Sequence, residues 1–434
     1  MSAAPVHLVN ARLIDPGDNF DGPGALRIAD GVIEDVHKGT SPDLPVSTET
    51  IDCMGLPIAP GIIDMRVFVG EPGGQHRETF RSASEAAAAG GVTTIVAQPD
   101  TDPVLDDPAL VEFVLSRARD ASKVNVAVMG ALTRGLAGRE MTEQRLLLDA
   151  GAVALTDADH AVRDAKTMRG ILTYAHGTGA LVVHHVQEPS LSQGTCATSG
   201  EFASRRGLPA VPAIAERMML ERDLALIEST GARYHADQIT TEGALAPLLR
   251  ARDAHQPVTA ATSIHHLTLN EFDIANWRSF FKLTPPLRAE MDRLAVVDAV
   301  ASGLIDVIHS SHLPQDEETK RLPFEEAAPG AIGLETLLPA ALRLVHDGPM
   351  DLMTLFHRLS TRPAEILDLH GGRLAKGVPA DLVWFDPDRP FILDRETLKS
   401  RSKNTPFDRV TLQGKVLGTW VAGKRVHDAQ KDPS

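Results

Sequence analysis

Residues 85–97 read Glu-Ala-Ala-Ala-Ala-Gly-Gly-Val-Thr-Thr-Ile-Val-Ala, and this stretch contains the unit from which the fold is predicted. An alanine-rich run of high helix propensity comes first. Two glycines separate it from a β-branched run, which is typical of a buried parallel strand. A helix joined to a strand by so short a connection is the repeating unit of α/β proteins.

The same alternation continues along the middle of the chain. Helical stretches occupy residues 110–121, 166–175 and 216–227, and further strand-like runs occupy 125–129, 152–155, 181–185, 257–261 and 305–309. Such alternation predicts right-handed βαβ units, which occur in doubly wound sheets and in (β/α)₈ barrels. The long run of repeats favours the barrel.

Both ends of the chain have β character. Residues 25–36 form two apolar segments around Asp30-Gly31, a strong hairpin signal because both positions tolerate positive φ. The other short apolar runs at the two ends are 8–14, 380–385, 410–412, 416–421 and 424–426. We expect the two terminal β segments to pair with each other in space.

Composition excludes several classes of function. The net charge of −15 over 434 residues, with no basic stretch, argues against nucleic acid and anionic membranes as partners. Cys53 and Cys196 form no paired motif, which indicates a reducing compartment. No signal peptide and no long apolar run stands out, so a cytoplasmic location is expected.

Several motifs resemble, in order, those of the type I dihydroorotases, which close carbamoyl aspartate to dihydroorotate in pyrimidine synthesis. They include Ala59-Pro-Gly-Ile-Ile-Asp64, Gly207-Leu-Pro-Ala-Val-Pro212, Ile264-His-His-Leu267, Lys282-Leu-Thr-Pro-Pro-Leu-Arg288 and Ser402-Lys-Asn-Thr-Pro-Phe407. The resemblance spans nearly the whole chain. It implies an α/β fold, with an amidohydrolase (β/α)₈ barrel over residues 59–371 and a small β-sandwich from residues 1–58 and 372–434.

The family's chemistry is altered at the end of barrel strand one. Amidohydrolases hold zinc through imidazoles and carboxylates at the C-terminal ends of strands. Where the family has His-x-His-x-Arg, this chain has Arg66-Val-Phe68-Val-Gly70. A guanidinium has no lone pair for a metal, so Arg66 and Phe68 replace two ligands. Gly70 replaces the arginine that clamps the substrate's carboxylate.

The other ligand positions are only partly retained. Asp157 and His185 match family ligands and are predicted to be a vestigial metal pair. Gln238 stands at the strand-six histidine, and Ser311 stands at the aspartate that moves protons in catalysis. A serine hydroxyl is no base near neutral pH without an activating partner. We therefore expect no intact catalytic group and no tightly bound cofactor.

The predicted substrate pocket has changed as well. Asp100 stands at the family's asparagine in Met-Pro-Asn-Thr, and Thr284 at the asparagine before Pro-Pro-Leu-Arg. His312, a substrate-contacting position in the family, is retained. With Gly70, these residues are the predicted pocket. Gaining an anion and losing a cation disfavours a dianionic substrate.

A rebuilt zinc site is the alternative, with ligands from Asp157, His185, His309 and Asp237. Buried histidines hydrogen-bonded to backbone are favoured over it. Strand alternation predicts that His184 and His235 face the surrounding helices, whereas His309 faces inward.

Arg66 has two interpretations. It pairs with Asp157 as a cation in place of the metal, or it reaches a ligand. A cation is needed because an unpaired buried Asp157 beside Asp100 would be costly. Asp159, His160 and Asp164 are predicted to be a solvated loop that enters a helix.

Two functions remain open, so the sequence leaves undecided whether the chain is an enzyme. The favoured one is a catalytically impaired protein that binds and organises aspartate transcarbamoylase, the preceding enzyme of the pathway, with an oligomer expected. The other is an active dihydroorotase or other cyclic-amide hydrolase with a remodelled metal site.

Overall fold

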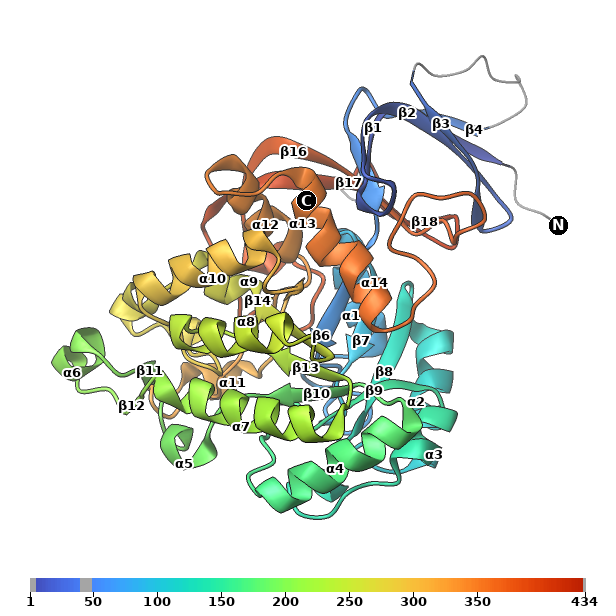
Figure 1. The fold of residues 1–434 in the computed structure, drawn as a ribbon. Coiled ribbons are helices and arrows are strands. Elements are labelled where there is room, and N and C mark those ends of the chain that lie inside the picture. Colours follow the sequence, from blue (N-terminus) through green and yellow to red (C-terminus); the bar gives the residue numbers. More distant parts are fainter. Residues whose placement is uncertain (1–4, 40–48, 432–434) are drawn as a thin grey trace.

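The structure is a computed structural model that describes residues 5–39 and 49–431 (Figure 1). Within these two ranges, no helix combines the length and the apolar composition that a membrane crossing requires. A barrel occupies the middle of the chain, and a sheet built from both ends lies beside it.

The barrel has eight parallel strands in sequence order. They are β6 (Ile62–Val67), β7 (Val92–Ala97), β8 (Asn125–Ala131), β9 (Ala152–Thr156), β10 (Val182–His185), β13 (Tyr234–Asp237), β14 (Val258–Ser263) and β15 (Val307–His309). The first and last strands meet just beyond β15, where the Phe68 amide donates to the His312 carbonyl at 2.9 Å. The predicted barrel is confirmed.

Helices surround the barrel (Figure 1). The longer ones are α1 (Phe80–Ala89), α2 (Pro108–Ala121), α4 (Ala165–Thr178), α7 (Ile214–Thr230), α8 (Leu245–Asp253), α10 (Glu290–Ser302) and α12 (Leu337–His346). Shorter ones are α3 (Gln144–Asp149), α5 (Pro189–Ser192), α6 (Glu201–Arg206), α9 (Ile264–Thr268), α11 (Glu317–Arg321), α13 (Leu352–Phe356) and α14 (Arg362–Ile366). The short strand β11 (Ala197–Thr198) pairs with β12 (Ala210–Val211).

The two glycines between α1 and β7 are required by close packing and by backbone conformation. A Cβ on Gly90 would lie 2.1 Å from the carbonyl oxygen of Leu334, and Gly91 has φ +80°. A residue with a side chain would therefore push α1 away from the barrel or strain the turn. The helix–strand unit of residues 85–97 thus forms as predicted.

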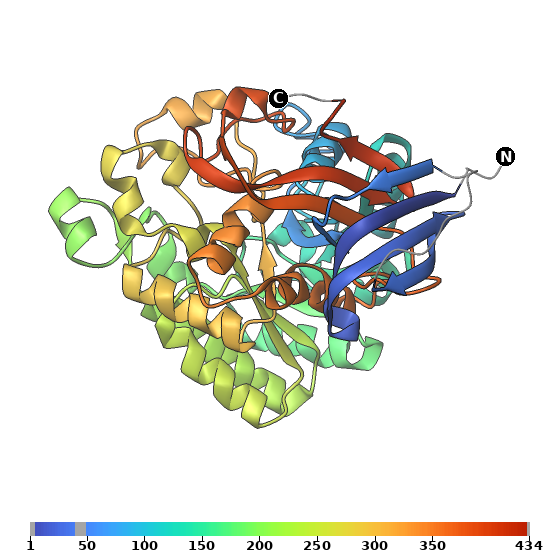
Figure 2. The same ribbon diagram turned by 90° about the horizontal axis from the view of Figure 1, so that it is seen from above.

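The terminal segments form one mixed sheet (Figure 2). Its order is β18 (Lys424–Asp428), β17 (Thr411–Val421), β16 (Leu382–Ile392), β5 (Pro57–Pro60), β1 (Val6–Asp15), β2 (Phe20–Ala29) and β3 (Val32–Lys38), and β4 (Glu49–Asp52) pairs with β1. The hairpin turns at Asp30 and Gly31, both with positive φ. Pairing of β16 with β5 joins the two ends as expected, and the exact domain boundaries stay a prediction.

The strands of the barrel separate an inner core from an outer one. Val183 and Ala261 pack in the inner cluster, whereas Tyr234 and Ala236 pack in the outer one, against the helices. His235, between the last two, therefore faces inward, and its Nδ1 lies 2.7 Å from the Thr259 hydroxyl. The predicted outward orientation of His235 is wrong. Side chains alternate between the two faces of a strand, and the residues on either side of His235, Tyr234 and Ala236, both face outward.

Candidate functional site at the barrel mouth

A buried guanidinium lies at the end of β6. Arg66 Nη2 is 2.5 Å from Asp159 Oδ1, and Arg66 Nη1 forms an ion pair with Asp237 Oδ2. The Arg66 side chain is 8% exposed and that of Asp237 is 5% exposed. One cation thus bridges carboxylates that follow β9 and end β13. The expected pairing of Arg66 with Asp157 is wrong.

Asp157 instead fixes the loop after β8. Its Oδ1 accepts hydrogen bonds from the amides of Leu132 and Thr133, each at 2.9 Å, and its Oδ2 accepts one from the Thr133 hydroxyl at 2.5 Å. Both oxygens are therefore occupied by protein donors. The vestigial metal role of Asp157 stays a prediction, and in this structure the residue is a loop anchor.

Asp159 belongs to the site, contrary to the prediction of a solvated loop. Ala158 has φ +51°, so the chain turns sharply after β9 and brings the Asp159 carboxylate to Arg66. Asp164 does have the predicted role, since its carboxylate accepts from the Thr167 amide at 2.7 Å and caps α4. The sequence signal for Asp159 was a second acid close to a strand end.

Gln238 and Ser311 are in direct contact. The Gln238 Nε2 donates a hydrogen bond of 2.6 Å to the Ser311 hydroxyl. Both residues follow a barrel strand and adopt positive φ, 56° and 50°, which is uncommon for residues with a side chain. The structure thus brings together Gln238, predicted to stand at a metal-ligand position, and Ser311, predicted to stand at the position of the catalytic aspartate.

Two imidazoles lie beside the Arg66 bridge. His309 Nε2 is 3.3 Å from Asp237 Oδ1, and His309 is fully buried. Burial lowers the pKa of His309 to about 3, and Arg66 acts in the same direction. Burial also lowers the pKa of His185 to about 3, although Asp159 opposes that shift. Both rings are therefore neutral at physiological pH.

A second carboxylate lies near Asp159. Burial raises the pKa of Asp100 to about 6, and the charge of Asp159 adds to the effect, whereas Arg66 and Arg77 oppose it. Asp100 Oδ1 is buried and, among the residues that the structure describes, has no hydrogen-bond partner. The carboxyl is therefore incompletely satisfied, and its place in a substrate pocket stays a prediction.

The segment after β6 is tightly packed. A Cβ on Gly70 would lie 2.0 Å from the carbonyl oxygen of Gly74, so position 70 has no space for a side chain. The Phe68 ring lies under the Arg77 guanidinium, whose Cζ is 4.0 Å from the ring centroid. These two positions therefore serve packing in this structure.

His312 lies in a buried network. Its Nε2 is 3.3 Å from Glu78 Oε2, and its Nδ1 accepts from the Gly333 amide at 3.2 Å. Both ring nitrogens are thus engaged by the protein, and the predicted substrate contact of His312 stays untested.

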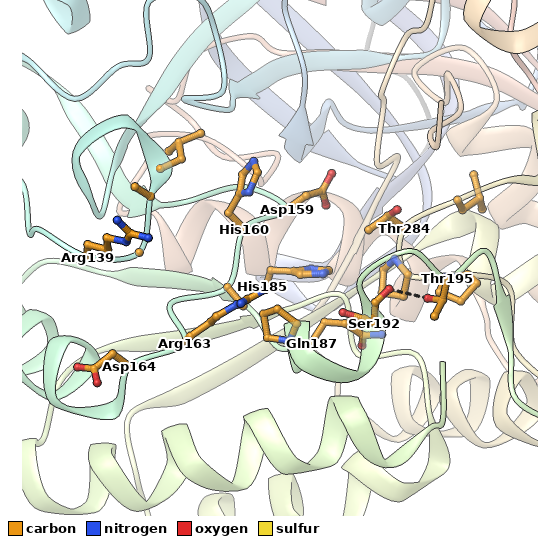
Figure 3. Close-up of a pocket in the computed structure, with 18 residues that line it drawn as sticks. Arg139, Asp159, His160, Arg163, Asp164, His185, Gln187, Ser192, Thr195 and Thr284 are labelled. Atoms are coloured by element: carbon orange, nitrogen blue, oxygen red, sulfur yellow. Dashed lines mark hydrogen bonds between the residues drawn. The ribbon is translucent and has the colours of Figure 1, made fainter. Parts of the chain in front are cut away.

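A cavity of about 570 Å³ opens above the site. Asp159, His185 and Thr284 contribute to its wall, as Figure 3 shows, so two of the predicted residues line it together with one that was not predicted. Its rim carries Arg139 and Arg163, which sequence analysis did not single out because no motif marks them.

The residues present do not fit a hydrolytic zinc site. Arg66 lies between Asp159 and Asp237, so the carboxylates that could bind a metal are neutralised by a tethered cation. Over residues 5–39 and 49–431, no group of three or more His, Cys, Asp or Glu side chains has a metal-binding arrangement. A structural zinc site has four protein ligands, and a catalytic zinc site has three and a water.

Comparison with known proteins identifies the family. Residues 55–244 match the family described as dihydro-orotase-like. A dihydroorotase of Anaplasma phagocytophilum (strain HZ) is 38% identical over 429 residues, which cover 98% of this chain and 96% of the relative. The chain belongs to the dihydroorotase-like family.

Other relatives agree with this assignment. A dihydroorotase-like protein of Pseudomonas aeruginosa is 38% identical over 423 residues, covering 98% of this chain and 99% of the relative. The solved structure of an L-hydantoinase (dihydropyrimidinase) from Arthrobacter aurescens matches with a TM-score of 0.89 and 25% identity, over 98% of this chain and 96% of that one. The resemblance read from the motifs and the amidohydrolase barrel are both confirmed.

Proposed function

We propose that this dihydroorotase-like protein acts in pyrimidine synthesis as a structural partner of aspartate transcarbamoylase and has lost metal-dependent hydrolysis. The observation that carries the proposal is the Arg66 guanidinium bound by Asp159 and Asp237. Breaking a buried ion pair leaves an uncompensated charge, so a metal ion would have to displace the guanidinium at high cost.

Neither Ser311 nor His309 supplies a substitute for the hydrolytic machinery. Opening a cyclic amide needs an activated water and a group that moves its proton. The Ser311 hydroxyl accepts from Gln238, an amide that cannot activate it. His309 has a pKa of about 3, far below the range in which an imidazole is an effective base.

The partner role rests on what the chain retains. The eight barrel strands and the mixed terminal sheet are formed, and at the barrel mouth Arg66, Gln238 and Ser311 are engaged by other side chains of the protein. Such a chain remains useful if its surface stabilises another protein. An obligate interface of this kind buries more than about 2,000 Å² and is relatively apolar.

Co-expression with the aspartate transcarbamoylase of the same organism tests the proposal. We expect one co-migrating species in size-exclusion chromatography, and a transcarbamoylase that loses activity or thermal stability when this chain is omitted. An unrelated barrel protein of similar size serves as the control. Two species that elute separately at micromolar concentration, with the transcarbamoylase fully active alone, would contradict the proposal.

A second candidate is a cyclic-amide hydrolase with a remodelled site. Asp100 favours it, because a carboxyl with a pKa of about 6 and an unpartnered oxygen has the properties of a general base. Hydrolysis of dihydroorotate by the purified protein, abolished in Asp100→Asn and unaffected in Asp149→Asn on the exposed face of α3, would establish this function instead.

A further inference from the structure

We propose that Arg139 and Arg163 form an anion clamp at the rim of the barrel-mouth cavity, which binds a small molecule carrying a carboxylate or phosphate group. Both guanidiniums line the same cavity of about 570 Å³ (Figure 3). The inference extends the proposed function, since it names a ligand class for a mouth that does not hydrolyse.

Arg139 is presented by a rigid loop. Asp157 holds the start of this loop through Thr133, and the Thr133 hydroxyl in turn accepts from the Gly138 amide at 2.8 Å. Gly138 has φ +67°, a conformation that glycine adopts without strain. Within residues 5–39 and 49–431, the Arg139 guanidinium has no hydrogen bond or ion pair, so it is available to a ligand.

Arg163 is presented by a second rigid segment. His184 accepts from the Val162 amide at 2.9 Å and lies 2.7 Å from Asp223. Arg222 donates to the carbonyls of Val162 and Arg163, at 2.7 and 3.0 Å. In the part of the chain that the structure describes, the Arg163 guanidinium itself donates one hydrogen bond, of 3.4 Å, to the Gln193 side chain. Buried groups with no catalytic role thus hold the backbone that carries this cation.

Nearby carboxylates do not occupy the clamp. Asp159 is neutralised by Arg66, and Asp164 caps α4. Two guanidiniums on the wall of one cavity can each donate hydrogen bonds to an anionic ligand held there.

The inner wall of the cavity indicates the chemistry of the other end of the ligand. His185 is 3% exposed, and its Nδ1 has no hydrogen-bond partner among the described residues. Since the ring is neutral, it offers a hydrogen bond without charge. Thr284 lies on the same wall. The ligand class is therefore a small molecule with an anionic end toward the rim and an uncharged polar end inside.

Titration calorimetry of the full chain tests the clamp with two probes, inorganic phosphate and L-dihydroorotate, which separate the two anion types. We expect at least one probe to bind with a millimolar or lower Kd. Arg139→Ala and Arg163→Ala each weaken this binding about ten-fold or more, and added salt weakens it in the wild type. Both side chains are at the surface, and circular dichroism melts verify that the variants fold.

Arg145→Ala is the matched control. Its guanidinium lies 2.9 Å from Asp149 Oδ1 on α3, away from the cavity, so binding should stay at the wild-type level. The clamp is refuted if neither probe binds the wild type, or if the Arg139 and Arg163 variants bind as the wild type does. The measurement needs no partner chain, so its outcome is independent of co-migration with the transcarbamoylase.

Discussion

The side-chain amide of Gln238 lies 2.6 Å from the hydroxyl of Ser311 and joins the ends of two barrel strands. The Gln238 amide donates this hydrogen bond and the Ser311 hydroxyl accepts it. Arg66 forms ion pairs with Asp159 and Asp237. Polar side chains at the barrel mouth are therefore satisfied by other groups of the protein.

Arg66→Met is expected to lower the free energy of unfolding by about 3–5 kcal/mol, because it leaves the buried Asp237 and the partly buried Asp159 without their cation. Urea denaturation at pH 7 measures the change. Arg145→Ala, which breaks an exposed pair with Asp149, should cost no more than about 1 kcal/mol. Equal stability of the Arg66 variant and the wild type would show that the bridge does not hold the mouth together.

Asp157→Ala should destabilise the protein by about 2–4 kcal/mol, since three hydrogen bonds to a carboxylate are lost and two buried amides lose their acceptor. The zinc content after dialysis should be the same in the variant and the wild type, well below one ion per chain. Thermal denaturation measures the loss of stability, and elemental analysis measures the zinc content. Stoichiometric zinc in the wild type that disappears in the variant would make Asp157 a ligand and not a loop anchor.

The quadruple variant R66H/F68H/Q238H/S311D should bind zinc before it shows any dihydroorotase activity. The four changes restore imidazoles and a carboxylate at strand ends, whereas the pocket still carries Asp100 and lacks a clamp at position 70. Elemental analysis and a hydrolysis assay give the two readouts. Near-normal turnover of this variant would mean that the charge of the pocket does not matter.

Gly70→Arg should fail as a repair of the substrate clamp. Its Cβ would lie 2.0 Å from the carbonyl of Gly74, so the segment has to move before any guanidinium can reach the pocket. We expect a loss of stability of about 1–3 kcal/mol, as for other overpacked sites. Gly177→Arg on exposed α4, where a Cβ has open space, is the control.

Asp100→Asn is expected to stabilise the protein in a pH-dependent way. The folded-state pKa of Asp100, about 6, lies above the ordinary value of 3.8, so ionisation of this carboxyl disfavours the folded state. The wild type therefore loses stability as pH rises from about 4 to above 6, by up to about 3 kcal/mol. The variant lacks this loss, and the two proteins should match below pH 4. Urea denaturation midpoints of the two proteins, measured between pH 4 and 8, test this expectation. A difference in stability between them that does not change with pH would exclude titration of Asp100 as the cause.

The fold was predictable from local pattern, but the contacts of the site were not. Helix and strand periodicity are properties of short segments, so the βαβ units and the terminal strands follow from them. The long run of repeats and the family resemblance favoured the barrel over a doubly wound sheet. The ion-pair partners of Arg66 depend on the positive φ of Ala158, which turns Asp159 toward the site. Alanine is not a residue type that predicts a positive φ, so the sequence did not indicate this turn. Gln238 also has positive φ and ends the alternation of β13, which lets it and Asp237 both reach the site.

The position of β5 in the terminal sheet has a consequence for the order in which the protein can be completed during synthesis. β5 ends at Pro60, yet one of its neighbours is β16, which begins at Leu382. A ribosome must translate more than three hundred residues before this edge is covered. Until then, the backbone N–H and C=O groups on this edge of β5 can pair with strands of other nascent chains. Pairing with β16, near the C-terminal end of the chain, removes this risk of aggregation.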